Sequence, residues 1–544
     1  KEQIEEAMVT VSVYDADTFS RDDLIGSYSF DASYVYFQKH HEVHNQWVGI
    51  TDPTNADDTG VQGYLKLSVA VLGPGEKRHQ YDAKEEAEMA AKEKQQGVQS
   101  MLLMPPQIQR QLKFLVITIH AADNLPAMDA DTIFSKAGID AYVEAVFGSM
   151  PAVRTRFKTI KGPSCTLKAS FDTELWMPVL TPTMTNNIEL SLWDYDRLAK
   201  NDRVRTIFLK YNAIEKYGRP PVWMPVYGAP NGVDFGNVKN YMNRYPGSAS
   251  NFRGRLLVSA KVVSDRDTIK DEKEEVKTKV AAPLPPRLSP PMRRLVLRAL
   301  IVSGSELPRF KRDVGVNTGI ISGDLGIEVC CGQYSVHSQR QKNYKGVCHW
   351  AALEEIQIQI PADKAYVPDT FVYLYRGDIT KGKHTRVAFA RIPTAGLEEQ
   401  GFNVEPWWQP LQEDKAINAL SDDENPGSIL IKLGVGTVEH ASDNPWETDL
   451  EALSDLTPYQ LRVHVYQGRN LPAADDNASL DPYLRINMNG EEQDTSIKTM
   501  STAPAWYETI QMDLMLPPLQ YAPQVLIQLW DWDKLSADDL VGRV

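Results

Sequence analysis

Short stretches in which every second residue is apolar recur along the chain and predict half-buried β-strands. Three of them end in an aromatic residue followed by an aspartate. Their apolar positions are Val9, Val11 and Val13, then Ile188, Leu190 and Leu192, and finally Val525, Ile527 and Leu529. Because the same strand pattern returns three times, the sequence contains an internal repeat.

Each of these strands leads into an acidic loop with the spacing D-x-D-x5-D. The three sets are Asp15, Asp17 and Asp23; Asp194, Asp196 and Asp202; and Asp531, Asp533 and Asp539. Two carboxylates about 4 Å apart repel each other by roughly 4 kcal/mol near a protein surface. A solvated acidic loop would explain one copy, but three copies favour bound cations, and hard oxygen ligands indicate calcium.

Composition narrows the class of protein. With 544 residues the chain is too long for one core, and three to five domains are expected. Its net charge of -14 argues against a general nucleic-acid binder and suits calcium ligation. It contains no apolar run long enough for a transmembrane helix and begins without a signal peptide. Its 4 irregularly spaced cysteines suggest a reducing compartment.

Strand patterns and charged or proline-rich stretches divide the chain into six predicted segments. These are the C-terminal part of a sandwich (1–74), a charged linker (75–111), a sandwich with a long irregular insert (112–263), a charged and Pro-rich linker (264–294), a divergent sandwich (295–440) and a sandwich truncated at its end (458–544). The first segment has about three strand patterns, fewer than a sandwich needs. We therefore expect the chain to be a piece of a longer protein.

Three sequence stretches resemble the C2 domain: LPAADDNASLDPY, PAW-x-E and WDWD-x5-D-LVG, all after residue 470. The resemblance implies eight-stranded antiparallel Greek-key β-sandwiches whose apical loops bind calcium and membranes. It adds first-loop ligands to the two later acidic sets. The implied sets are Asp475, Asp481, Asp531, Asp533 and Asp539, and Asp129 (or Asp131), Asp140, Asp194, Asp196 and Asp202.

The order of the segments is similar to the central part of a ferlin. GYLKLSVAVLGPG closes the first segment, and a YGAP-containing insert and a RGRLLVSA strand lie in the third. Ferlins act in calcium-triggered vesicle fusion and membrane repair, so the resemblance implies an anionic phospholipid membrane as partner and leaves fusion-machinery proteins open. It places the chain at the cytoplasmic face of a vesicle or of the plasma membrane, with any transmembrane anchor outside this chain.

Two groups of residues are candidates for membrane contact. Phe19, Leu198 and Leu535 each lie two residues after the second aspartate of their loop. There they would either insert into lipid or fold back onto the loop. The basic residues Arg154, Arg156 and Lys158 are expected on a strand, and in C2 domains a basic strand surface often meets phosphoinositide headgroups. Protection of an exposed sheet edge is the alternative explanation.

The segment 295–440 departs from the calcium pattern. Arg376 stands where the first aspartate belongs, and only Asp324 and Asp378 remain of the acidic set. A calcium-insensitive scaffold for protein partners is therefore the alternative function, together with a synaptotagmin-like tether. The chain contains no GxSxG, P-loop or kinase motif set, so we do not expect an enzyme.

Overall fold

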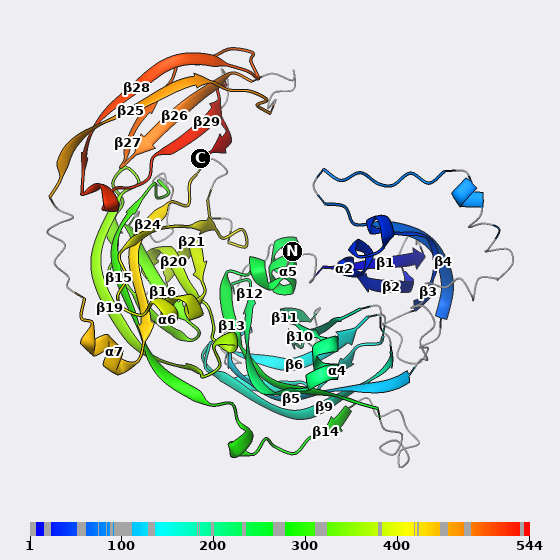
Figure 1. Cartoon of the computed structure of the whole chain (residues 1–544). Helices are drawn as coiled ribbons and strands as arrows, with labels where there is room; N and C mark the ends of the chain where they lie inside the picture. The colour runs from blue at the N-terminus through cyan, green and yellow to red at the C-terminus, as the bar shows by residue number, and fades with distance from the viewer. Residues whose placement is uncertain are drawn as a thin grey trace. The chain divides into compact units, whose positions relative to one another are not determined.

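The computed structural model of the chain consists mainly of antiparallel β-sheets (Figure 1). Strands account for 58% of it and helices for 13%, which confirms the all-β class. The structure describes residues 7–15, 23–51, 61–73, 75–82, 84–87, 91, 111–128, 137–148, 150–181, 183, 185–196, 201–230, 236–264, 278–309, 324–378, 383–417, 419–420, 424–446, 455–472, 480–533 and 538–544. Within those ranges, no helix is long and apolar enough to cross a membrane.

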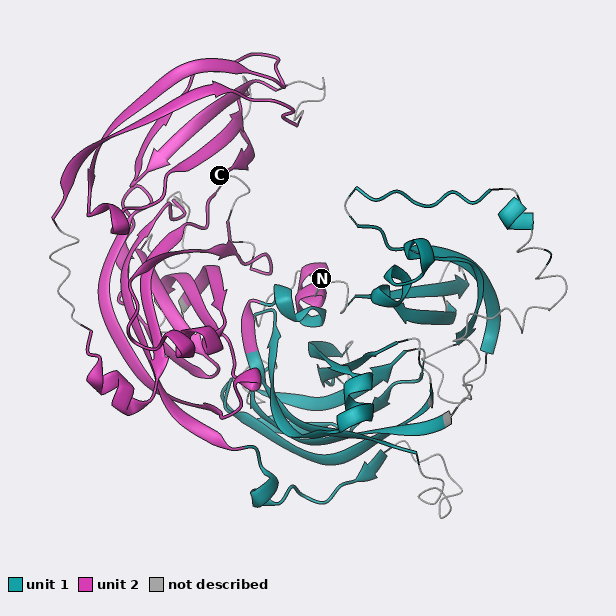
Figure 2. Ribbon diagram, viewed as in Figure 1, with its two compact units in different colours: residues 1–231, 243–249, 253–290 teal, residues 232–242, 250–252, 291–544 magenta. Residues whose placement is uncertain are grey.

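The chain divides into two compact units, which we describe separately (Figure 2). Unit 1 comprises residues 1–231, 243–249 and 253–290, and unit 2 comprises residues 232–242, 250–252 and 291–544. Unit 1 holds the first sheet and the second sandwich. Unit 2 holds the third and fourth sandwiches.

The first sheet has four strands in the order β1-β2-β3-β4. Its elements are β1 (Met8–Asp15), β2 (Asp23–Asp31), α2 (Ala32–Tyr36), η1 (Lys39–His41), β3 (Glu42–Thr51) and β4 (Val61–Ala70). The sequence pattern predicts about three strands here, and β3 is the strand that it does not predict. A register shift between Val43 and Gln46, where Asn45 has φ 53°, breaks the alternation of β3 and hides it from the pattern.

The second sandwich has two sheets, in the orders β11-β10-β6-β7, with β8 beside β6, and β12-β13-β5-β9-β14. Its strands are β5 (Gln111–Leu125), β6 (Gly138–Phe147), β7 (Val153–Arg154), β8 (Lys158–Lys161), β9 (Leu167–Thr181), β10 (Asn187–Asp194), β11 (Asp202–Lys210), β12 (Arg219–Gly228), β13 (Asn251–Val263) and β14 (Thr278–Val280). Ile117 of β5 and Leu190 of β10 are fully buried in its core. Each such side chain contributes roughly 1.5–3 kcal/mol by leaving water.

Two stretches of this sandwich differ from the sequence prediction. The insert predicted as irregular contains strand β12 and three helical segments, which are α4 (Tyr211–Tyr217), α5 (Gly236–Arg244) and η3 (Pro246–Ser248). In addition, β14 lies within the predicted linker and pairs with β9 as an edge strand. The Nζ atom of Lys279 on β14 lies 4.8 Å from the ring centroid of Trp176. This contact between a lysine and an aromatic ring helps to hold β14 at the edge of the sheet. The alternation of apolar residues does not reveal so short a strand.

The third sandwich has sheets in the orders β19-β15-β24-β22 and β17-β16-β20-β21-β23, with β18 beside β16. Its strands are β15 (Met292–Ser305), β16 (Asp324–Cys331), β17 (Tyr334–His337), β18 (Gln341–Lys342), β19 (Cys348–Pro361), β20 (Thr370–Asp378), β21 (Lys383–Ile392), β22 (Trp407–Pro410), β23 (Gln412–Glu413) and β24 (Ser428–Gly436). Its helices are η6 (Lys364–Tyr366), α6 (Thr394–Gln400) and α7 (Val438–Asp443). The short helix η5 (Pro286–Leu288) precedes β15 in the sequence and belongs to unit 1.

The fourth sandwich pairs β25 with β28 and orders its second sheet β27-β26-β29-β30. Its elements are β25 (Thr457–Gln467), β26 (Pro482–Met488), β27 (Glu491–Asp494), β28 (Ala505–Leu516), η7 (Leu519–Tyr521), β29 (Leu526–Asp531) and β30 (Asp539–Arg543). The alternate residues Ile510, Met512 and Leu514 of β28 are buried against the facing sheet. This is the period-two burial that the alternation predicts.

A buried carboxylate joins the first sheet to the second sandwich within unit 1. Asp31, at the end of β2, is 4% exposed. It accepts hydrogen bonds from Thr185 Oγ1 at 2.8 Å, the Asn186 amide at 2.7 Å and Asn187 Nδ2 at 3.3 Å. A buried carboxylate with several donors is costly to remove, because its donors would then be unsatisfied.

We predict that Asp31→Ala destabilises the contact between the first sheet and β10 by about 1–3 kcal/mol. The matched variant Thr185→Val removes one donor only and should cost less. Amide hydrogen exchange of the peptide around Asn187, measured in the whole chain, should accelerate strongly in the first variant and weakly in the second. Equal exchange in wild type and Asp31→Ala would contradict the assignment.

Candidate calcium sites at the sandwich ends

The acidic repeat folds as two strand ends joined by a loop, with a β-bulge at the same place in each copy. The strand register shifts between Val13 and Tyr14 in β1, between Leu192 and Trp193 in β10, and between Leu529 and Trp530 in β29. A bulge twists its strand and turns the following side chains out of the regular ladder. The aspartate that follows the aromatic residue is thereby placed at the mouth of the loop.

The first and third aspartates of each set are direct cross-strand partners. The pairs are Asp15 with Asp23, Asp194 with Asp202, and Asp531 with Asp539. Directly opposed residues of an antiparallel pair have Cβ atoms roughly 4.5–5.5 Å apart. The D-x-D-x5-D spacing therefore brings two like charges to one strand end, as expected for a site that a cation completes.

The second and fourth sandwiches tie the first loop to this strand end by the same two hydrogen bonds. In the second, Asp194 Oδ1 accepts from the Asp140 amide at 2.7 Å, and the Tyr195 amide donates to the Asp140 carbonyl at 2.9 Å. Asp194 is 3% exposed. The structure thus brings together Asp140, Asp194 and Asp202, which lie on three strands that neighbour one another in one sheet.

In the fourth sandwich, Asp531 Oδ1 accepts from the Asp481 amide at 2.6 Å, and the Trp532 amide donates to the Asp481 carbonyl at 3.0 Å. Asp481 Oδ1 in turn accepts from the Met500 amide at 2.6 Å. Each of these bonds uses one oxygen of its carboxylate. A carboxylate has about four lone-pair sites, so a bond to an amide is compatible with ligation of a cation.

In the second and fourth sandwiches, a polar residue directly before the third aspartate joins the two ends of the loop as a brace. The Asp533 amide donates to Asp538 Oδ1 at 3.2 Å, and Tyr483 OH donates to Asp538 Oδ2 at 2.7 Å. Burial and this bond to Asp538 raise the pKa of Tyr483. Sequence reasoning missed Asp538, although a polar residue stands at that place in all three copies.

The second sandwich repeats this brace with an amide side chain. The Asp196 amide donates to Asn201 Oδ1 at 3.1 Å, and Asn201 Nδ2 donates to Tyr142 OH at 3.0 Å. In each sandwich the brace joins the loop to a tyrosine of the neighbouring strand. The two ends of the loop are therefore joined, from Asp196 to Asn201 and from Asp533 to Asp538, by contacts that do not themselves require a cation.

Several predicted residues lie outside the described ranges. They are Asp17, Phe19, Asp129, Asp131, Leu198, Asp475 and Leu535, and Asp23 is described in its backbone only. Over the part of the chain that is described, no group of three or more histidine, cysteine, aspartate or glutamate side chains is arranged to hold a metal ion. The donors that are described supply oxygen ligands only, which fits calcium.

The predicted basic residues lie on an exposed sheet edge. Arg154 on β7 and Lys158 on β8 are exposed, as is Arg156 between them, and both strands pair with β6 alone. The Arg154 guanidinium lies 6.0 Å from the ring centroid of Tyr142, the tyrosine that also braces the loop. Exposure at an edge suits headgroup contact and edge protection equally.

The third sandwich places Arg376 in register with the first aspartate of the other sandwiches. Its strand β20 has the same register shift, between Leu374 and Tyr375, and Arg376 faces Thr385 across the pair. Arg376 therefore occupies the position that the first aspartate has in the other sandwiches, as the sequence indicates. Instead of two opposed carboxylates, this strand end carries a fixed positive charge and a hydroxyl.

A comparison with known families now identifies the class. The C2 domain family matches residues 2–50, 113–226 and 459–544. The chain is therefore a protein with several C2 domains. Among the predicted aspartates that the structure describes, Asp15, Asp194, Asp202, Asp531 and Asp539 lie at strand ends of the matched ranges.

Individual proteins that are similar to this chain include ferlins. The chain is 26% identical over 303 residues to Myoferlin of Xenopus tropicalis, across 48% of this chain and 15% of that protein. It is 20% identical over 562 residues to Ferlin 2 of Toxoplasma gondii, across 96% of this chain and 37% of that protein. Together with the C2 domains, these matches support a ferlin-family chain. It spans 15% of the length of the first of these relatives and 37% of the length of the second.

Among solved structures, the two calcium-bound C2 domains of Extended-Synaptotagmin 2 are 14% identical and match 59% of this chain and 95% of that chain. The TM-score is 0.20, so the likeness carries no argument about function.

The end of the third sandwich also contains a carboxyl group whose ionisation costs stability. Glu306 follows β15 with φ 57°, and burial raises its pKa to about 7, against an opposing effect of Arg309. A pKa raised by folding stabilises the fold at low pH, and this stabilisation is lost as the pH rises toward and through 7.

We predict that wild-type unit 2 loses about 2 kcal/mol of stability relative to Glu306→Gln between pH 5 and pH 8. The reason is that glutamine keeps the shape but cannot ionise. Calorimetry of both chains across this range measures the difference. Glu399→Gln, on the exposed side of α6, is the control and should follow wild type at each pH. A parallel pH profile for Glu306→Gln and wild type would refute the prediction.

Proposed function

We propose that this ferlin-family chain binds calcium at its C2 domains and, through bound calcium, binds anionic phospholipid membranes. The observation that supports this most is the opposed aspartate pair, which is repeated with the same amide contacts in the second and fourth sandwiches. Opposed carboxylates are unfavourable without a cation and become ligands with one. Calcium would supply the positive charge that joins these oxygens to lipid phosphate.

The chain's own residues would set the ligand geometry. In the fourth sandwich, Asp481, Asp531, Asp533 and Asp539 would hold calcium together with Asp475. Calcium takes 6–8 oxygens, so lipid phosphate, water or backbone carbonyls complete the shell. Without calcium, this end is negative and an anionic leaflet repels it. With calcium bound, the local field reverses and attraction follows.

The role in the cell is proposed on the same basis. A chain with calcium-dependent membrane contact at several domains can act in vesicle fusion, exocytosis or membrane repair, at the cytoplasmic face of the membrane. Linked domains strengthen attachment, because the second binding event is effectively intramolecular. No step of this function needs a catalytic residue, and we propose a binding protein rather than an enzyme.

The first test replaces two aspartates of the fourth sandwich. Asp531→Asn with Asp533→Asn should weaken one class of calcium sites at least tenfold, a loss of about 1.4 kcal/mol. Asparagine keeps the oxygen that accepts from the Asp481 amide, so the loop should remain folded. Isothermal titration and co-sedimentation with vesicles of phosphatidylserine and phosphatidylcholine measure the two effects. Asp513→Asn, exposed on β28, is the matched control.

Since the second sandwich carries an equivalent set, the same pair of changes at Asp194 and Asp196 should remove a further class of sites. The chain with all four substitutions should lose most calcium-dependent vesicle binding. Unchanged calcium affinity in this chain, with circular dichroism like that of wild type, would show that the aspartates only brace loops.

The third sandwich should bind no calcium, because the Arg376 guanidinium occupies the register position of a ligand. Titration of residues 291–446, which contain both of its sheets and its core, should show no saturable heat at micromolar calcium. The second sandwich, residues 111–281, serves as the positive control. Saturable binding by the third sandwich at these concentrations would count against the assignment of Arg376.

A further inference from the structure

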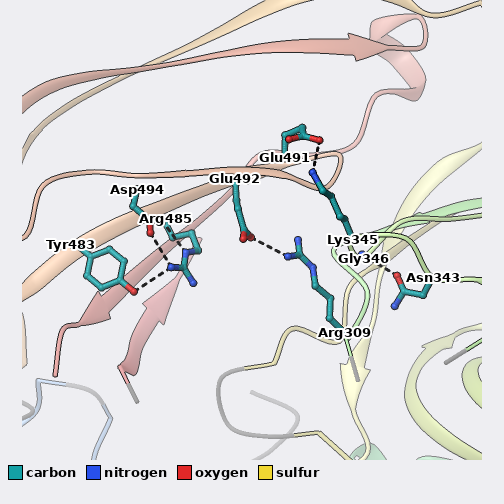
Figure 3. A network of polar contacts seen from close by, with 9 residues as sticks. All are labelled: Arg309, Asn343, Lys345, Gly346, Tyr483, Arg485, Glu491, Glu492 and Asp494. Atoms are coloured by element: carbon teal, nitrogen blue, oxygen red, sulfur yellow. Dashed lines mark hydrogen bonds and ion pairs between the residues drawn. The ribbon is translucent and has the colours of Figure 1, made fainter. Parts of the chain in front are cut away.

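Two ion pairs join the third and fourth sandwiches inside unit 2 (Figure 3). Arg309 Nη1 lies 3.1 Å from Glu492 Oε2, and Lys345 Nζ lies 2.9 Å from Glu491 Oε1. Both positive groups come from the third sandwich and both negative groups from consecutive residues of the fourth. All four side chains are between 41% and 57% exposed, so both ion pairs lie at the surface of unit 2.

The basic residues lie at the end of the third sandwich that corresponds to the aspartate end of the others. Arg309 belongs to the segment after β15, which matches the first loop of the fourth sandwich. Lys345 lies between β18 and β19, and the Gly346 carbonyl accepts from the Leu307 amide at 2.9 Å. Arg376, at the end of β20, lies at the same end, because its cross-strand partner Leu325 begins β16.

The acidic residues lie at the opposite end of the fourth sandwich. Glu491 begins β27, directly after the turn that joins it to β26. On β26, Pro482 faces Asp531 at one end, whereas Asn487 faces Leu526 at the other end, next to the turn. We call this second end the turn end. The sandwiches are therefore arranged head to tail within unit 2.

Shape complementarity accompanies the charges at this contact. Asn489 and Gly490 both have positive φ, of 53° and 81°, as a two-residue hairpin turn of type I′ requires. A Cβ atom on Gly490 would lie 3.1 Å from the Lys345 carbonyl oxygen and 3.2 Å from its Cβ. The backbone of one sandwich thus approaches the backbone of the other so closely that a side chain would be crowded.

Hydrogen bonds within each sandwich support the two turns that meet at this contact. Asn343 Oδ1 accepts from the Gly346 amide at 2.9 Å, and Asn343 Nδ2 donates to the Pro308 carbonyl at 2.7 Å. On the other side, Arg485 donates to both carboxylate oxygens of Asp494, at 2.8 and 2.9 Å, across β26 and β27 (Figure 3). The charged groups are therefore presented by supported hairpins rather than by unsupported side chains.

Two hydrogen bonds to backbone carbonyls extend the contact. Trp408 Nε1 donates to the Tyr521 carbonyl at 3.2 Å, and Arg543 Nη1 donates to the Glu424 carbonyl at 3.2 Å. Exposed ion pairs contribute about 0–1 kcal/mol each, too little to hold two domains together alone. Because the two sandwiches are linked in one chain, however, several weak contacts form at a high effective concentration.

We propose that the end of the third sandwich has exchanged calcium ligation for docking of the fourth sandwich. In this assignment, Arg309 and Lys345 bind the acidic turn end of the fourth domain through their ion pairs with Glu492 and Glu491. The fourth sandwich is held by the end that carries no calcium ligands. Its aspartate end lies on the far side of the domain and remains available. The docking contact does not rest on the proposed function, since neither ion pair includes a predicted calcium ligand, whereas the exchange of calcium ligation for docking does rest on it.

Zero-length carbodiimide cross-linking of the whole chain, without calcium, tests the contact. The reagent joins an amine to a carboxylate only where they touch, so mass spectrometry should find Lys345 coupled to Glu491. Lys113 and Glu215, also 2.9 Å apart but within the second sandwich, are the internal control for reactivity and folding. We expect the Lys345 product to fall at least fivefold above about 0.5 M NaCl, because exposed charges are screened there.

A charge exchange makes the test specific. Lys345→Glu and Glu491→Lys should each abolish the product, and the two changes together should restore a cross-link of reversed polarity. Mixing the chain with its ¹⁵N-labelled form distinguishes contact within one chain from contact between two. Three results would overturn the proposal: no Lys345 product where the Lys113 control forms, no restoration in the exchanged chain, or products of mixed isotope composition.

Discussion

Opposed aspartates repel each other across the ends of β10 and β11, and again across β29 and β30. The bulge before the first aspartate creates this opposition, because it shifts the register by the amount that brings residues eight apart face to face. Roughly 4 kcal/mol of repulsion near a surface is a large part of a domain's stability. The backbone amide of Asp140 or Asp481 offsets part of this repulsion by donating to the first aspartate of the pair. Asn201 or Asp538 joins the two ends of the loop. A cation would complete the compensation.

Strand alternation was sufficient to predict the all-β class. The acidic spacing predicted Asp194 and Asp202 on one loop, and their direct pairing across β10 and β11 was not predicted. Both predictions depend on local periodicity, which a sequence displays directly. The braces through Asn201 and Asp538 escaped prediction because a polar residue beside an aspartate has no periodic signature. β3 escaped because its bulge interrupts alternation, and β14 escaped because it is short, charged and held at an edge by one aromatic ring.

The contact between the third and fourth sandwiches illustrates a different limit. The sequence pair Asn489 and Gly490 indicates a hairpin turn on local grounds, since both positions need positive φ. It does not reveal that Lys345, far away in the chain, faces that turn. Long-range partners of exposed charges follow from the packing of whole domains. For this reason, charge alone on Glu491 and Glu492 carries no information about their partner.

The sign of the charge at one end of the sandwich connects these observations. With aspartates at the register position after the bulge, that end attracts cations and would repel an acidic turn such as Glu491–Glu492. With Arg376 at that position, and with Arg309 and Lys345 at the same end, the charge there is positive, which opposes a cation and attracts the turn. One scaffold therefore supports two incompatible kinds of contact, and a few side chains select between them. A domain that docks its neighbour in this way cannot also bind calcium at the same place, so loss of the ligands and gain of the docking surface are a single electrostatic change.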